Sequence, residues 1–305
     1  MNGRRTQLDA AAMLVMLVLC ASWGLQQVAV KVANAGISPL LQAGLRSLGA
    51  AALVWAWSAH RGIRLFGNDG TLVPGLVAAA LFAGEFAFIY AGLAFTTASR
   101  SVIFLYTAPF FIALGAHFFL PGERLRPLQW AGLLCAFAGI VAAFAEGLSS
   151  PSRRELAGDA MVLLAAVLWA ATTLVIKGSR LAKVSPAKTL FYQLAGSAVA
   201  LPLASLALGE PGIVNPTPLV LACLAYQTVL VAFVSYLAWF WLITRYPAGR
   251  LASFAFLTPL FGMLAGGLLL SERIGGALVL AMLLVGAGIW LVNRPAGSGT
   301  GDGGS

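Results

Sequence analysis

A succession of long apolar stretches, separated by short turn-rich segments, constrains this chain more than any other feature. A helix of about 20 apolar residues spans the hydrocarbon core of a bilayer, and ten stretches of this chain approach that length with few charges. The stretches cover approximately residues 10–31, 40–59, 72–94, 98–120, 127–146, 157–177, 187–208, 217–243, 249–270 and 275–293. They do not show the period of two residues that marks a membrane β-barrel. The sequence therefore predicts an all-α membrane protein with ten transmembrane helices.

Composition excludes an ordinary soluble fold. Of the 305 residues, 60% are hydrophobic and 10% are charged, whereas about 25% of residues are charged in typical soluble domains. A soluble fold of this size could not bury so much apolar surface. Cys20, Cys135 and Cys223 all lie within apolar stretches, which indicates buried thiols rather than disulfides.

The placement of Lys and Arg predicts the orientation of the chain. With the N-terminus in the cytoplasm, 13 of the 19 Lys and Arg residues fall on the inner side and 5 on the outer side, with Arg46 inside a stretch. Positive charge gathers on the cytoplasmic side of membrane proteins, so we expect a multi-pass protein of the plasma (inner) membrane with both termini cytoplasmic. The net charge of +9 follows from this asymmetry and from contact with anionic membrane lipids, and it requires no nucleic-acid partner.

The chain also contains an internal repeat. The corresponding positions are Trp23 and Trp169, Lys31 and Lys177, Gly49 and Gly196, Phe86 and Tyr236, Pro109 and Pro259, and Glu123-Arg124 and Glu272-Arg273, at offsets of 146 to 150. Each half then holds five apolar stretches, and because five is odd the second half enters the membrane from the opposite side. We therefore expect a five-helix repeat over residues 1–147, an inverted five-helix repeat over residues 148–294, and a flexible Gly/Ser-rich tail over residues 295–305.

Short segments at matched places in the two halves carry a family resemblance. They are ASWG at residues 21–24, LWAA at 168–171, TAPF and LTPL around Pro109 and Pro259, and PGERL and SERI shortly after these prolines. On these segments the chain resembles, over nearly its whole length, the EamA-type members of the drug/metabolite transporter superfamily. Its aromatic-rich interior is similar to that of the aromatic amino acid exporters. The resemblance implies a ten-helix bundle with a central cavity between the halves, and transport by alternating access.

Pro109 and Pro259 lie near the centres of matched stretches, with Tyr106 and Phe256 about one helical turn before them. A proline removes a backbone donor, and within lipid the carbonyl left over must find another partner or face a cavity. Transporters place such bent helices around the substrate at the membrane midplane. We therefore expect helix kinks at both prolines beside the substrate site. A packing kink without ligand contact is the alternative.

Aromatic side chains hold corresponding positions in the two halves. A two-fold-related lining of this kind would suit an apolar, planar substrate through stacking or cation–π contacts. Placement toward lipid or the membrane interface, which is usual for Trp and Tyr, is the alternative. The candidate substrate-binding aromatic residues are Trp23, Phe86, Tyr90, Tyr106, Trp169, Tyr236 and Phe256.

Two charged side chains, Arg46 and Glu85, fall inside apolar stretches. Ionisable groups at membrane depth are costly and mark functional sites by default. Arg46 would attract a substrate carboxylate, and Glu85 would attract an amine or carry a proton for coupled transport. A mutual ion pair that only holds helices together is the alternative. Lys31 and Lys177 stand at the ends of stretches and are expected to extend toward lipid headgroups.

The sequence contains no Walker A segment, no HExxH, no Cys/His metal spacing and no Gly-rich dinucleotide loop. We therefore expect a protein that is not an enzyme, with no catalytic residues, metal or cofactor. The sequence predicts a secondary transporter or facilitator that exports amino acids (aromatic or hydrophobic) or related small metabolites. An exporter of other drugs or metabolites, a passive pore and an intramembrane lipid-modifying enzyme are the alternatives. The coupling ion and the direction of transport stay open. A monomer agrees with the sequence, which does not exclude a dimer.

Overall fold

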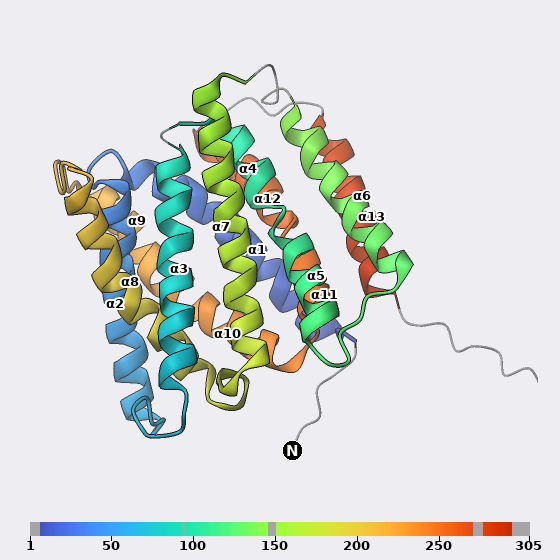
Figure 1. Ribbon diagram of the computed structural model, residues 1–305. Coiled ribbons are helices and arrows are strands. Elements are labelled where there is room, and N and C mark those ends of the chain that lie inside the picture. Colours follow the sequence, from blue (N-terminus) through green and yellow to red (C-terminus); the bar gives the residue numbers. More distant parts are fainter. Residues whose placement is uncertain (1–6, 94, 146–150, 271–276, 295–305) are drawn as a thin grey trace, which may run out of the picture.

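The computed structural model describes residues 7–93, 95–145, 151–270 and 277–294, and every regular element within them is a helix (Figure 1). The helical content is 81%, and one isolated bridge joins Ile37 to Ile213. The all-α expectation is therefore confirmed. The SERI segment and the tail over residues 295–305 lie outside the described residues.

The elements follow one another along the chain with short connections. They are α1 (Ala10–Ala33), α2 (Pro39–His60), α3 (Leu72–Leu93), α4 (Ala98–Leu105), α5 (Ala108–Phe119), α6 (Pro127–Phe144), α7 (Arg153–Gly178), η2 (Arg180–Lys183), α8 (Pro186–Ala207), α9 (Pro218–Tyr226), η3 (Gln227–Ser235), α10 (Tyr236–Arg245), α11 (Ala248–Phe254), α12 (Leu257–Leu270) and α13 (Ala277–Asn293).

Within the described residues, eight helical segments are long and apolar enough to cross a membrane. The two remaining apolar stretches of the sequence form α2, which has 22 residues and carries Arg46 and His60, and α13, which has 17 residues. A multi-pass membrane protein is thus supported, and the count of ten spans stays a prediction.

The bundle has two ends, which connect different sets of helices (Figure 1). We call the end that holds residues 61–71, 120–126, 179–185 and 246–247 the lower end, as it is drawn in Figure 1. The upper end holds residues 34–38, 95–97 and 208–217.

Polar caps fix where several helices begin. Asp9 accepts a hydrogen bond from the backbone N–H of Ala12 at the start of α1. Ser152 and Glu155 form a reciprocal capping box at the start of α7. These contacts satisfy backbone donors that a helix N-terminus leaves unpaired, which matters most where no water is at hand.

Three of the predicted spans are interrupted. α4 ends at Leu105 and α5 begins at Ala108, so that Pro109 lies in the first turn of a new helix. There the carbonyl oxygen of Phe104 accepts from the backbone N–H of Thr107 at 3.2 Å and from its hydroxyl at 2.6 Å, so this carbonyl is paired at the break. α11 and α12 are separated in the same way just before Pro259. The long stretch over residues 217–243 contains the π-helical segment η3 between α9 and α10.

The two halves of the chain interleave. The most extensive helix contacts are α6 with α13, α2 with α8, α3 with α7 and α1 with α12, and each joins one helix from either half. Small residues permit the closest of these approaches: a Cβ atom on Gly288 of α13 would lie 2.5 Å from the carbonyl oxygen of Gly132 of α6. The halves therefore share one packed interior rather than forming two separate bundles.

Candidate functional site

A cavity of about 660 Å³ extends from the middle of the bundle toward the upper end. Its walls come from the upper parts of α1 and α3, from α4, α7, α10 and α12, and from Phe144 of α6 and Gln193 of α8. Small-molecule sites typically occupy about 300–1,000 Å³, so the space suits a compact metabolite.

Six of the seven predicted aromatic residues line this cavity, and four of them belong to two packed groups. The Trp23 ring packs edge-on against Tyr236 and Trp239, with centroid distances of 6.4 and 5.7 Å. Its Nε1 donates a hydrogen bond to Ser235 Oγ at 2.8 Å, which fixes the orientation of the indole. The second group contains Trp169 packed edge-on against Tyr106 at 6.2 Å. The predicted aromatic residues that line the wall are Trp23, Phe86, Tyr90, Tyr106, Trp169 and Tyr236, and the wall also contains Phe82, Phe144, Trp239 and Phe240.

Three of the predicted site residues lie away from the cavity wall. Phe256 is fully buried and packs against Phe110 and Phe137 at 6.3 and 6.4 Å. Pro109 is buried in the first turn of α5, whereas Pro259 is part of the wall. Arg46 is 1% exposed and lies behind the lining side chains.

The two charges predicted inside spans have different surroundings. Glu85 lines the cavity, and no other acidic residue is found among the described residues of its wall. The Arg46 guanidinium lies over the Phe86 ring, 4.6 Å from its centroid. Arg46 and Glu85 influence each other electrostatically, but within the described residues no ion pair joins them. The structure therefore does not contain the direct ion pair considered from the sequence.

Several polar lining residues went unnoticed in the sequence. On α1 the wall includes Gln27, Lys31 and Asn34 together with Trp23, which are spaced by three or four residues. Side chains at this spacing share one face of a helix. A polar face within an otherwise apolar stretch is a sequence signal that would have found them. Lys31 lines the cavity and is exposed in the last turn of α1, so its extension to headgroups stays a prediction.

A buried polar cluster connects several elements at the lower end. The Lys177 ammonium is 2.6 Å from Glu123 Oε1, and it donates to the carbonyl oxygen of Tyr246 at 2.6 Å. Glu123 Oε2 accepts from the N–H of Ala248 at 2.7 Å, and the Tyr246 hydroxyl donates to Asp9 Oδ2 at 2.8 Å. We call Asp9, Glu123, Lys177, Tyr246 and the N–H of Ala248 the lower-end cluster. Lys177 is buried and paired with Glu123, so the expectation that it extends toward lipid headgroups is wrong.

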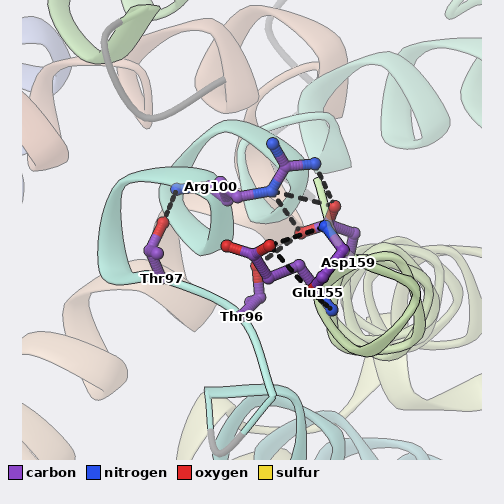
Figure 2. Close-up of polar contacts among 6 residues, drawn as sticks. Thr96, Thr97, Arg100, Glu155 and Asp159 are labelled. Carbon is purple, nitrogen blue, oxygen red and sulfur yellow. Dashed lines mark hydrogen bonds and ion pairs between the residues drawn. The ribbon is translucent and has the colours of Figure 1, made fainter. Parts of the chain in front are cut away.

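A second cluster lies at the upper end, where α4 meets α7 (Figure 2). Arg100 binds the carboxylate of Asp159 through Nε and Nη2, and the Thr96 hydroxyl donates to Asp159 Oδ1 at 2.6 Å. Both members of the ion pair are almost fully buried. We call Thr96, Arg100 and Asp159 the upper-end cluster. It links the first half of the chain to the second.

Asp69, in a loop outside the spans, shows a marked electrostatic effect. The buried ammonium of Lys188 donates to Asp69 Oδ2 at 2.7 Å, and the Thr71 hydroxyl also donates to this carboxylate. These hydrogen bonds lower the pKa of Asp69 from 3.8 to about 2, and the bond from Lys188 has the largest effect. A loop at the lower end is thereby fastened to the start of α8.

Among the described residues, His, Cys, Asp and Glu side chains form no group that could hold a metal ion.

Comparisons with known proteins agree with this architecture. The chain matches the EamA-like transporter family over residues 10–145 and 156–294. An Archaeoglobus fulgidus protein named as an uncharacterized transporter is 27% identical over 293 residues, which cover 92% of this chain and 96% of the relative. An Escherichia coli protein named as a probable amino-acid metabolite efflux pump is 29% identical over 289 residues and 92% of each chain.

A solved crystal structure that is 20% identical in sequence superposes with a TM-score of 0.79 over 93% of this chain and 96% of the other. At that identity the likeness establishes the fold alone. The resemblance expected from the repeated segments is confirmed by the family match, which indicates a membrane transporter rather than an enzyme. The chain belongs to the EamA-like transporter family.

Proposed function

We propose that this protein is a secondary transporter or facilitator that exports aromatic or hydrophobic amino acids, or related small metabolites, across the plasma membrane by alternating access. The observation that carries the proposal is the cavity, in which aromatic side chains from both halves surround a space of about 660 Å³. The cavity extends toward one end, while the lower-end cluster ties helices together at the other. The name of the Escherichia coli relative, a probable amino-acid metabolite efflux pump, supports the general kind of transport.

The proposed membrane arrangement is ten transmembrane helices in two inverted five-helix repeats, with both termini cytoplasmic. The repeats would cover residues 1–147 and 148–294, in agreement with two successive family matches. Labelling of single cysteines tests this arrangement, because Asn68 lies at the lower end and Ile213 at the upper end. A membrane-impermeant thiol reagent added to intact cells should modify Ile213→Cys but not Asn68→Cys. Modification of both from the same side would contradict it.

Transport itself is tested in proteoliposomes. Purified protein should support saturable counterflow of phenylalanine, tryptophan or leucine, measured against a panel of amino acids with and without a pH gradient. Alternating access requires that external substrate accelerate the exit of internal substrate. Flux that rises linearly with concentration and shows no counterflow would indicate a passive pore instead.

Glu85 is the proposed proton-coupling residue, because its carboxylate belongs to the cavity wall at membrane depth. Glu85→Gln should change the transport rate or its response to a pH gradient. Glu155→Gln is a matched control, since Glu155 is half-buried outside the cavity wall and glutamine can replace glutamate in its capping box. An identical pH profile for wild type and Glu85→Gln would remove the coupling role and leave Glu85 as a binding or packing residue.

A further inference from the structure

The guanidinium of Arg46 is surrounded by side chains of the cavity wall. Its charge lies over the Phe86 ring and interacts with Glu85, Tyr90 and Tyr236. All four of these residues line the cavity, although Arg46 itself does not. Arg46 therefore lies directly against Phe86, a residue of the cavity wall.

Two nitrogen atoms of Arg46, Nε and Nη2, have no hydrogen-bond partner among the described residues. The other buried side-chain atoms without a partner belong to neutral amides or hydroxyls. A buried cation whose donors are unsatisfied is far more costly than a neutral group in the same situation. An acceptor that binds these two N–H groups would recover much of this cost.

Nε and Nη2 form one edge of the planar guanidinium, and that edge matches the two oxygen atoms of a carboxylate. The same chain already uses this edge elsewhere. Arg100 binds the carboxylate of Asp159 through its own Nε and Nη2, as Figure 2 shows. Asp159 therefore shows which chemical group satisfies the edge that Arg46 presents.

We propose that Arg46 is the carboxylate-recognition residue of the substrate site, and that a carboxylate is an obligatory part of the substrate. This inference rests on the proposed transport function and narrows its substrate class. A change of the Phe86 rotamer brings the Arg46 edge into the cavity, where the substrate carboxylate binds Nε and Nη2. Glu85 then lies on the same side of the cavity to compensate an α-ammonium group. The aromatic side chain of the substrate packs against the Trp23 and Trp169 groups.

The test compares L-phenylalanine with L-phenylalaninamide, which keeps the ring and the ammonium but has no carboxylate. Each compound competes against radiolabelled L-phenylalanine, both for binding to purified protein and for counterflow. In wild type the acid should compete about ten- to a hundredfold better than the amide, the range expected for charge-assisted hydrogen bonds.

Arg46→Gln should remove most of this preference, and Arg46→Lys should keep only part of it, because lysine retains the charge but lacks the planar edge. The ratio of acid to amide is independent of how much protein folds, so poor expression does not obscure it. Arg245→Gln is the matched control: Arg245 lies over the Trp241 ring at 4.5 Å, much as Arg46 lies over Phe86, but it is exposed and outside the cavity. It should keep the wild-type ratio.

The outcomes separate the two proposals. Equal competition by acid and amide in wild type, or an unchanged ratio in Arg46→Gln, would overturn the role of Arg46 while saturable counterflow still supports the transporter. Absence of binding and counterflow for the whole amino-acid panel would overturn the proposed function and this inference together.

Discussion

The two ends of the bundle are built from residues that correspond at an offset of 150, yet they are connected differently. Asp159, Thr96 and Arg100 at the upper end match Asp9, Tyr246 and Arg250 at the lower end. In both places a hydroxyl donates to the aspartate, from Thr96 to Asp159 and from Tyr246 to Asp9.

The arginines differ. Arg100 binds the Asp159 carboxylate and so joins the two halves, whereas Arg250 donates to the backbone carbonyl of Asn293, at 3.4 Å and within its own half. The lower end adds the ion pair of Lys177 with Glu123, which also joins the halves. Corresponding residues thus hold the two ends together by different contacts. If the proposed alternating-access mechanism holds, this difference marks one state of the cycle, in which the cavity extends toward the upper end.

The largest expected effect comes from breaking the lower-end ion pair. Lys177→Met leaves Glu123 buried without its cation, and removal of one partner of a buried pair typically costs about 3–5 kcal/mol. We expect a clear fall in the thermal unfolding temperature of the purified protein in detergent. The double variant Lys177→Met/Glu123→Gln should recover part of this loss, because the unpaired charge is gone. A single variant as stable as wild type would show that the pair does not hold the lower end.

The second prediction sharpens the comparison of the two arginines. Arg100→Lys keeps the charge but loses the paired hydrogen bonds to Asp159, and charge-assisted hydrogen bonds contribute about 1.5–3 kcal/mol each. Arg250→Lys loses one long bond to a carbonyl and should cost clearly less. Thermal unfolding of both variants, side by side, measures the difference. Equal losses of thermal stability in the two variants would mean that Arg100 and Arg250 stabilise their ends equally. This result would contradict the difference in their hydrogen bonds.

The sequence predicted the helical class and the family from general features, namely apolar stretches of membrane length and segments repeated in both halves. It also predicted six aromatic residues of the cavity wall, because matched positions in two repeats tend to face the same interior. It could not place Phe256, which lies between α11 and α12. The contact of this side chain with Phe110 and Phe137 depends on how α5 and α6 pack against that break.

The sequence misplaced Lys177 for a related reason. A lysine at the end of a span is long enough either to reach lipid headgroups or to pair with a buried acid. Which of the two occurs depends on whether the fold brings an acidic residue close to it. Here Glu123 lies 54 residues earlier in the chain and meets Lys177 only after α5 and α7 pack together. Arg46 shows the same limit, because its place behind Phe86 depends on how α2 packs against α3.

The third prediction concerns the two aromatic groups of the cavity. Trp23→Ala or Trp169→Ala removes a large lining ring, and loss of such apolar burial should weaken binding by about 1–3 kcal/mol. This corresponds to about ten- to a hundredfold in affinity. Transport of phenylalanine and tryptophan should fall more than transport of alanine or threonine at equal membrane expression. Equal loss for all substrates would indicate a folding defect, and no loss would show that these rings do not contact substrate.

The smallest expected effect lies outside the cavity, at the Asp69–Lys188 contact of the lower end. The pKa of Asp69 is lowered from 3.8 to about 2, chiefly by the hydrogen bond from Lys188. A carboxyl whose pKa is lower in the folded state stabilises the fold above its unfolded pKa, and this stabilisation disappears as the pH falls through the folded pKa. Asp69→Asn should therefore lower the unfolding temperature slightly and by a constant amount from pH 8 to pH 5, because the amide oxygen can still accept from Lys188. The difference between wild type and variant should shrink only below about pH 4, where Asp69 begins to be protonated in the unfolded chain. A difference that already vanished between pH 7 and pH 5 would mean that Lys188 does not hold this carboxylate ionised, and that the lower end depends on the lower-end cluster alone.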